Sequence, residues 1–346
     1  MDINGFIATT ATLEERGELD KLDEIGLPPG NAIQWLFGLT AGFYFADGET
    51  LRTRRAALDL ALRYYDVTKG NTNLLTVGGR PRRVSSRDDI ERHLAQSNYA
   101  DEKETAGFYI RRMPAKALRS TDPVHDYLTA LLPGIGYRGG CGHLMYQTRL
   151  SQLSLDPIGV VRFFVDACRD LQVFYAVSGM SLFFYSYATG ATERAYPLFR
   201  RFPGLLYEDG IRFGLIISQR IDVIRDVNWL TAVNDELLER VGGLEKAREV
   251  LGDEIVLHPY EGGVVFQAGE RPVLGDLNKG RVPAAYRAVN DFLKPLRYEN
   301  WDYPYLRAPY GVDEMEYTQW WTRRFDAADG QRDDQQPCRD RPRAFP

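Results

Sequence analysis

Residues 33–45 are the part of the sequence that most constrains the fold. They form an uncharged run of aromatic, aliphatic and β-forming residues, IQWLFGLTAGFYF. Such a run predicts a buried strand, and the Ala46-Asp47-Gly48 that follows is typical of a turn. Residues 50–65 then carry one apolar stripe at helical spacing, made of Leu51, Leu58, Leu62 and Tyr65. The folded part of the chain is therefore expected to begin with a strand, a turn and a helix.

The same alternation of strand and helix patterns continues along the chain. Ser86 can accept from the free amides of a first helical turn, and Ile90 and Leu94 would then face inward. Asp156-Pro157 predicts a second helix start, with an apolar stripe that reaches Leu171. The patterns also predict helices over 193–199, over 229–241 and from 282 onward, and strands over 105–113, 173–176, 180–187, 211–218, 254–258 and 264–268.

These elements predict an α+β fold with mixed or antiparallel strands. We expect two strand-rich parts with helices packed on one face, and the pattern leaves open whether the strands form one sheet or two. The strands around Ser178-Gly179 are expected to form a hairpin or an adjacent pair. Residues 254–258 and 264–268 flank the turn sequence YEGG and predict a second hairpin.

The distribution of charged residues and of Gly and Pro residues divides the chain into an amino-terminal leader, a central body and a carboxy-terminal tail. The 346-residue chain has a formal net charge of −5, and residues 1–30 alone hold seven acidic and two basic residues, a local balance of −5. The Gly- and Pro-rich sequence GLPPG closes this segment. We expect an acidic, partly flexible leader over 1–30, a domain over 31–325 that could consist of two similar halves (31–150 and 151–325), and a disordered polar tail over 326–346.

Composition excludes several classes of protein. The net charge of the chain outside the leader is zero, which argues against a protein whose main role is to bind nucleic-acid phosphates. The three cysteines are far apart and predict neither a disulfide framework nor a structural zinc site. No apolar run approaches the roughly 18 residues that span a bilayer, and the amino-terminal sequence lacks the pattern of a signal peptide. We therefore expect a cytoplasmic protein.

The motifs predict no catalytic residue, cofactor or metal site. Residues 134–139 match GxGxxG, but no buried strand leads into them and no helix can start after them. The four histidines lack metal-ligand spacing, and Ser178-Gly179 lacks the nucleophile elbow. The alternative that stays open is an enzyme of unknown reaction with a loop site around Gly134–His143, in which Arg138, Cys141 and His143 would be the first candidates.

One segment stands out by its composition. Residues 299–321 combine five acidic residues and one arginine with seven large aromatic residues, Trp301, Tyr303, Tyr305, Tyr310, Tyr317, Trp320 and Trp321. The rings can pack onto the protein's own core. They can also anchor a partly exposed interface, where the acidic neighbours would attract a basic partner.

Several sequence blocks resemble the type VI secretion immunity family. The blocks are VNWLTA at 227–232, LLERVGG at 237–243, GGVVFQAG at 262–269 and PVLGDLN at 272–278, and GFYF at 42–45 agrees with the family's beginning. The resemblance covers roughly residues 30–325 and is strongest over 211–297. The matched residues are of scaffold type, with Asn228 as a plausible helix cap before Trp229.

The resemblance implies a non-enzymatic, cytoplasmic immunity protein. Such a protein binds a cognate effector toxin encoded by an adjacent gene and blocks its active site, and the family's partners include nucleases with PD-(D/E)xK sites. A nuclease active site is basic where DNA docks, which suits acidic surfaces here. The neutral body speaks against the third hypothesis, a DNA-binding repressor, and no membrane role is expected. The residues expected to contact the toxin are Asp313, Glu314, Glu316, Tyr317, Trp320, Glu14, Glu15 and Glu18.

Overall fold

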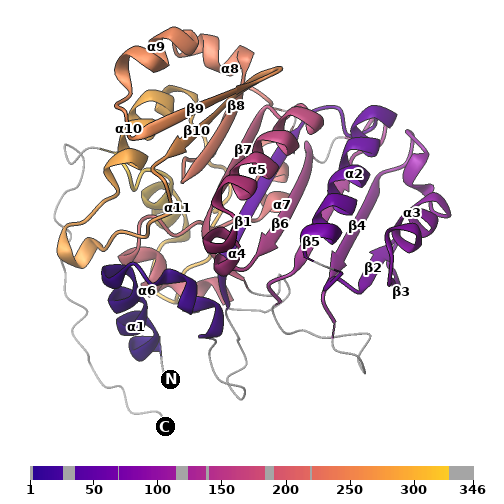
Figure 1. Cartoon of the computed structure of the whole chain (residues 1–346). Helices are drawn as coiled ribbons and strands as arrows, with labels where there is room; N and C mark the ends of the chain where they lie inside the picture. The colour runs from indigo at the N-terminus through magenta and orange to yellow at the C-terminus, as the bar shows by residue number, and fades with distance from the viewer. Residues whose placement is uncertain are drawn as a thin grey trace.

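The strands of the protein form one large antiparallel sheet (Figure 1). The structure is a computed structural model that describes residues 3–25, 36–68, 70–113, 124–137, 140–183, 191–218 and 220–326. The ten strands found among these described residues lie in the order β3-β2-β4-β5-β6-β1-β7-β8-β10-β9. Their bounds are β1 Leu36–Phe45, β2 Leu74–Val77, β3 Arg80–Arg83, β4 Ala106–Arg111, β5 Tyr127–Leu132, β6 Gly142–Thr148, β7 Tyr175–Phe183, β8 Leu230–Asn234, β9 Ile255–Tyr260 and β10 Gly263–Ala268. The α+β class is confirmed, and the choice that the sequence left open is resolved in favour of one sheet.

Two helices start at the caps predicted from sequence, Ser86 and Asp156, and a third starts at Thr50. Thr50, Ser86 and Asp156 each accept from a backbone N–H three residues on, and Pro157 is the first residue of its helix. The helices are α1 Ile3–Arg16, α2 Leu51–Val67, α3 Arg87–Ala95, α4 Leu150–Leu155, α5 Pro157–Leu171, α6 Ala191–Arg201, α7 Gly210–Ile217, α8 Asp235–Arg240, α9 Gly243–Val250, α10 Ala284–Leu293 and α11 Glu314–Thr322, with short 3-10 turns η1 Leu19–Glu24, η2 Asn98–Ala100, η3 Leu277–Lys279 and η4 Lys294–Leu296. No helix among the described residues is long and apolar enough to cross a bilayer.

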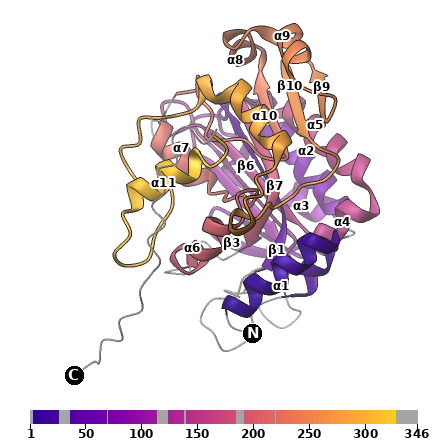
Figure 2. The same cartoon turned by 90° about the vertical axis from the view of Figure 1, so that its left-hand side faces the viewer.

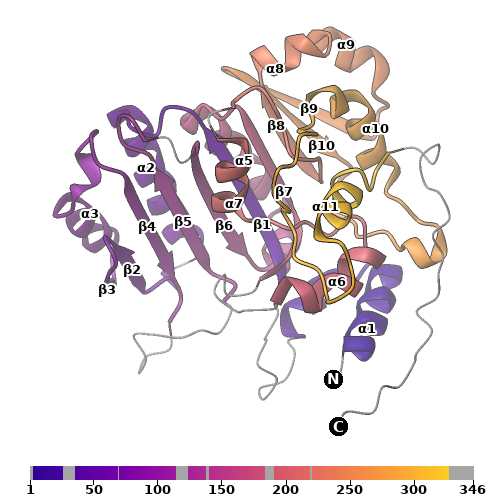
Figure 3. The same ribbon diagram turned by 180° about the vertical axis from the view of Figure 1, so that it is seen from behind.

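Helices cover both faces of the sheet, not one face as expected from the sequence. Successive residues of a strand point to opposite faces. In β1, the Phe43 ring lies 5.1 Å from Phe164 of α5, whereas the next ring, Tyr44, lies 5.1 Å from Phe213 of α7. We call the Phe43 side the front face and the Tyr44 side the back face. The front face carries α2, α3 and α5 (Figure 1), and the back face carries α7 and α11 (Figure 3).

The back face is covered only in part. Figure 3 shows β2, β4 and β5 with no described helix in front of them. Along β5, half-buried Tyr127, Thr129 and Leu131 alternate with buried residues that face α2. Thr129 pairs with Met145 of β6 and with Tyr109 of β4, and both are also half-buried. The described residues thus leave a stretch of sheet partly accessible beside α7; we call it the open half of the back face.

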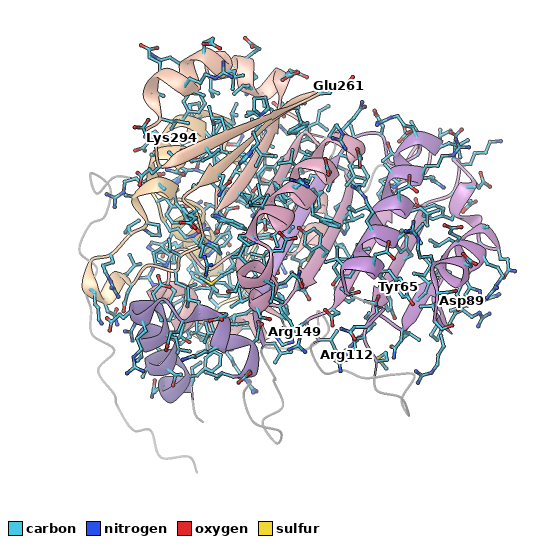
Figure 4. All side chains as sticks on the ribbon, viewed as in Figure 1. Tyr65, Asp89, Arg112, Arg149, Glu261 and Lys294 are labelled. Atoms are coloured by element: carbon cyan, nitrogen blue, oxygen red, sulfur yellow. The ribbon has the colours of Figure 1, made fainter. Side chains whose placement is uncertain are left out.

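Three predicted elements are wrong in type. β7 runs through Ser178-Gly179 without a hairpin, because both residues continue the pairing with β1. The glycine serves close packing, since a Cβ at Gly179 would lie 2.0 Å from Asn228 Oδ1. The predicted strand over 211–218 is α7, capped by Asp209. The predicted helix over 229–241 begins as β8 and becomes helical only at Asp235. The predicted β9–β10 hairpin is confirmed, with Glu261 at its tip (Figure 4).

The acidic leader is part of the folded body over its described residues. Phe6 of α1 is fully buried and stacks on Phe37 of β1, with ring centroids 5.4 Å apart. Asp23 accepts from the backbone N–H groups of Leu150 and Ser151 at the start of α4. The expectation that the folded part begins only near residue 32 therefore fails, since a strongly acidic segment can still bury one apolar face. The predicted tail lies outside the described residues from position 327.

Candidate interaction site

The aromatic and acidic segment at 299–321 is divided between the core and the surface. Tyr305 and Trp321 are fully buried, and Tyr317 and Trp301 are only 3% and 7% exposed. Tyr303, by contrast, is 69% exposed, and Tyr310 is fully exposed. The core interpretation is confirmed for the buried rings, and the interface interpretation stays a prediction for the exposed ones. The buried rings attach the segment to the back face, and the exposed rings are available for contact.

Tyr305 is the ring that connects this segment to the rest of the back face. Its hydroxyl accepts from Arg225 Nη1 at 2.7 Å and from the Asp209 backbone N–H at 2.8 Å. Its ring lies 6.2 Å from Phe213 of α7 and 6.0 Å from Trp321 of α11. These contacts fix α7, α11 and the segment between Trp301 and Tyr305 against one another.

A buried network of four charged side chains lies beneath this segment. Arg225 Nη1 lies 3.0 Å from Glu208 Oε2, and Arg225 Nε lies 2.8 Å from Asp226 Oδ1. Asp226 Oδ2 in turn accepts from Arg324 Nη2 at 2.8 Å. All four side chains are at most 1% exposed. Two acidic and two basic groups compensate one another, which burial requires.

The charges in this network hold the structure together and are not accessible to a substrate. The hydroxyl of Tyr44 donates to Glu208 Oε1, so the network reaches β1 at the centre of the sheet. Burial raises the pKa of Glu208, and the neighbouring Arg225 guanidinium opposes that rise. The sequence signal for this network is a charged pair, Arg225-Asp226, inside an otherwise apolar stretch. The sequence analysis did not use it.

The acidic residues predicted to contact a partner have different surroundings. Asp313 caps α11 by accepting from the backbone N–H groups of Met315 and Glu316, and Glu314 pairs with Arg307 at 2.9 Å. The Glu316 carboxylate is exposed, as is that of Asp302, and neither has a hydrogen-bond or ion-pair partner within the described residues. These two carboxylates give the segment an uncompensated negative charge.

The two aromatic residues predicted to contact a partner are less accessible than the acids. Tyr317 is buried, with its ring 4.7 Å from Tyr196 of α6. Trp320 is half-buried and carries the Arg200 guanidinium 4.0 Å from its ring centroid. The two rings thus join α11 to α6, and only Trp320 contributes to the surface.

The leader's predicted contact residues are used mainly within the molecule. Glu14 accepts from the backbone N–H groups of Leu274 and Gly275, and burial raises its pKa. Glu15 pairs with Lys279, and Glu18 pairs with Lys21 at 2.7 Å. The structure does not bring these acids together with α11, because α6 lies between α1 and α11 (Figures 2 and 3).

The loop proposed for the enzymatic alternative contains buried groups. His143, the second residue of β6, is 3% exposed, and a Cβ on Gly210 of α7 would lie 2.6 Å from its ring. Burial lowers the pKa of His143 to about 4 and raises the pKa of the Cys141 thiol to about 12. Arg138 lies outside the described residues. Within the part of the chain that the structure describes, no three His, Cys, Asp or Glu side chains form a group that could hold a metal ion.

The outer surface of α7 is a feature that the sequence analysis missed. Ile211 and Leu215, one helical turn apart, are 55% and 54% exposed, whereas Phe213 and Ile217 of the same helix are buried. Arg212 Nε donates to the carbonyl of Pro304 at 2.9 Å and ties α7 to the acidic segment. The back face thus presents an apolar helix surface directly beside exposed acids and tyrosines.

Comparisons with known proteins agree with this fold. The model of the TsiV family, described as "Type VI immunity for VRR-NUC", matches residues 49–325. A solved structure of a T6SS protein from Pseudomonas aeruginosa is similar, with a TM-score of 0.72 at 19% sequence identity, over 85% of this chain and 83% of that chain. At that identity the similarity shows a common fold. No curated protein matches the chain.

Proposed function

Because the chain belongs to the TsiV family of type VI immunity proteins for VRR-NUC effectors, we propose that it binds one cognate nuclease effector and neutralises it by covering the active site. The family match over residues 49–325 is the observation that carries this proposal. The role is non-enzymatic, since the protein acts by occupying a surface that the substrate needs. The complex forms in the cytoplasm, where the DNA that the toxin attacks is located, and the toxin is encoded by an adjacent gene.

The charge of the acidic segment supports this partner class. A nuclease must bind phosphates and therefore presents a basic surface around its active site. Exposed Asp302 and Glu316 oppose such a surface, and Tyr303 and Tyr310 supply rings of the kind that anchor interfaces. Complementary charge would also accelerate association at low salt.

The proposed contact surface adds Asp302, Tyr303 and Tyr310 to the residues predicted from sequence and keeps only part of that predicted set. It contains Asp313, Glu314, Glu316 and Trp320, whereas the buried Tyr317 supports it from below. In the leader, Glu14 holds α1 in place. Glu15 and Glu18, whose side chains are 41% and 35% exposed, would make a second, weaker contact.

The enzymatic alternative has less support. It needs Cys141 and His143 as reactive groups, and both are buried at the start of β6. With a pKa of about 12, the Cys141 thiol stays protonated at neutral pH, and a thiol in that form is a poor nucleophile. With a pKa of about 4, His143 is a neutral imidazole at the same pH.

Co-expression with the effector encoded in the adjacent gene tests the proposed function. We expect the wild-type protein to restore growth, to co-purify with the effector and to abolish its DNA cleavage at a one-to-one ratio. Continued killing together with a failure to co-purify would refute the proposal.

Charge reversal then tests the contact surface. Asp302→Lys with Glu316→Lys should weaken binding by ~10-fold or more at low salt, mainly through a slower association rate. These two residues are chosen because their carboxylates are exposed and make no hydrogen bond or ion pair among the described residues that the change would break. The matched control is Glu91→Lys with Glu261→Lys, two exposed acids on α3 and on the hairpin tip (Figure 4), which changes the net charge equally. Equal weakening by both pairs would remove the acidic segment from the interface.

A further inference from the structure

The outer surface of α7 has no described element packed on it. Residues 211 and 215 lie one turn apart on the side of the helix that faces away from the sheet. Each keeps more than half of its side chain accessible, which is unusual for two neighbouring aliphatic residues on an eight-residue helix whose other positions are mostly buried. Exposed single aliphatic residues are common, but a paired apolar stripe in such a position is typical of a contact surface.

The surroundings of α7 extend this stripe on both sides. On one side, Arg212 joins the helix to Pro304, next to exposed Tyr303 and Asp302. On the other side, α7 packs on β6, and β5 lies beyond it in the sheet (Figure 3). There the open half of the back face presents half-buried side chains, including Met145, Thr129 and the Tyr109–Tyr127 ring pair with centroids 6.0 Å apart.

We propose that the docking surface for the nuclease effector extends from the acidic segment across α7 onto the open half of the back face, with Ile211 and Leu215 as its apolar centre. This inference rests on the proposed function and specifies where on the molecule it occurs. The occupant is the basic, DNA-binding surface of the effector's nuclease domain. Its basic groups oppose Asp302, Asp313 and Glu316 at one rim, and its apolar groups cover the α7 stripe.

The apolar and charged residues of the proposed docking surface are distributed as in protein–protein interfaces of high affinity. Binding energy concentrates in a few well-packed apolar or aromatic residues near the centre, and charged residues at the rim act on association rate and on choice of partner. Here the aliphatic pair on α7 is central, tyrosines lie on both sides of it, and the acids occupy one edge. Acidic residues alone would give an interface that high salt dissolves; the apolar centre predicts a complex that persists in salt.

The front face provides a matched control. Leu155 and Ile158, at the junction of α4 and α5, are 78% and 70% exposed, which makes them more accessible than the α7 pair. They lie on the opposite side of the sheet, because α5 packs against Phe43. If exposure of aliphatic residues alone decided where the effector binds, this pair would be the better candidate.

The test compares two double variants of the full-length protein. Ile211→Gln with Leu215→Gln removes the apolar centre without adding charge and keeps good helix formers. Leu155→Gln with Ile158→Gln makes the same chemical change on the front face. Affinity for the purified nuclease domain of the cognate effector is measured by calorimetry at 150 mM and at 500 mM salt, after thermal unfolding has shown that both variants are folded.

We expect the α7 variant to bind about 100-fold more weakly at both salt concentrations, and the front-face variant to bind within 3-fold of wild type. In the wild-type complex, hydrogen exchange should slow over residues 127–147 and 210–217. An α7 variant within 3-fold of wild type, or protection confined to the front face, would overturn the inference and leave the proposed function intact. A wild-type protein that does not bind the effector refutes the proposed function instead.

A second copy of this chain is the other occupant that the experiment distinguishes. Light scattering of the free wild-type protein should give the mass of a monomer. A dimer that the α7 double variant dissociates would show that the stripe is a self-interface, and the inference would then be wrong.

Discussion

The front and back faces of the sheet are built from the same strands but are held in different ways. On the front face, Phe43 packs among the rings of Phe164 and Tyr146, and the buried Arg54 of α2 donates to backbone carbonyls such as those of Tyr99 and Glu104. On the back face, the next residue, Tyr44, hydrogen-bonds to Glu208 and lies among buried charges. Truncating a packed apolar ring costs free energy according to the area and volume lost, whereas removing one member of a buried ion pair leaves its partner's charge without compensation. The face that carries the proposed docking surface therefore also holds the ion pairs in which one substitution leaves a buried charge unpaired.

The largest effect is expected from removing one charge of the back-face network. Asp226→Ala leaves Arg324 without its carboxylate and Arg225 with one of two, so the free energy of unfolding should fall by about 3–5 kcal/mol. Urea denaturation at pH 7 measures the change. The control is Asp222→Ala, which breaks the exposed pair with Arg220 and should cost about 0–1 kcal/mol. Similar losses in the two variants would mean that the network contributes no more than a surface pair.

A smaller effect, on the same face, should appear on acidification. His143 has a folded-state pKa of about 4, against an ordinary value of 6.5, because burial disfavours its charged form. Below pH 6.5 the unfolded chain binds a proton that the folded chain does not, so stability falls as the pH drops from 6.5 toward 4. Between pH 7.5 and pH 5 this amounts to about 2 kcal/mol.

The variant His143→Met should lose this part of the pH dependence, because methionine has a similar shape and no titrating group. Unfolding midpoints at pH 7.5 and pH 5 are compared for wild type and variant. Parallel pH profiles for the two proteins would show that His143 is not buried in neutral form, and would bring it back as a candidate reactive group.

The smallest effect concerns a single hydrogen bond. Tyr44→Phe keeps the ring between Tyr175 and Phe213 but removes the donor to Glu208, which should cost about 1–2 kcal/mol. Tyr310→Phe, at a fully exposed ring, should change stability by less than about 0.5 kcal/mol. If both changes are neutral, the β1 end of the network does not stabilise the back face.

Features decided by short-range chemistry could be predicted from the sequence. The starts of α2, α3 and α5 depend on caps three residues away, and the β9–β10 hairpin depends on its turn. The errors arose where distant partners decide. The apolar run at 211–217 suits strand or helix equally, and its contacts with Tyr305 and Trp301 favour the helix. The local Asp209 cap agrees with a helix but was not recognised in the sequence. Similarly, β8 is a strand because β7 and β10 lie on either side of it.

The candidate site likewise has features that the sequence could predict and features that depend on distant contacts. Composition alone identified the segment at 299–321 as acidic and aromatic, but it could not say which rings face inward. Tyr305 is buried because its hydroxyl accepts from Arg225 and its ring packs against α7. Both partners lie 80 or more residues earlier in the chain. The exposed pair on α7 was not found, since its pattern was interpreted as a strand.

The ion pair between Arg324 and Asp226 can form only after the ribosome has synthesised the later of the two residues. The two residues are 98 positions apart in the chain. A ribosome that adds ~5–20 residues per second needs on the order of 5–20 s to pass from one to the other. During that interval Asp226 and Glu208 face Arg225 alone, and an unbalanced acid resists burial. A chain that stops before Arg324 therefore lacks one of the two cations of this network, and we expect its back face to be more open to proteases.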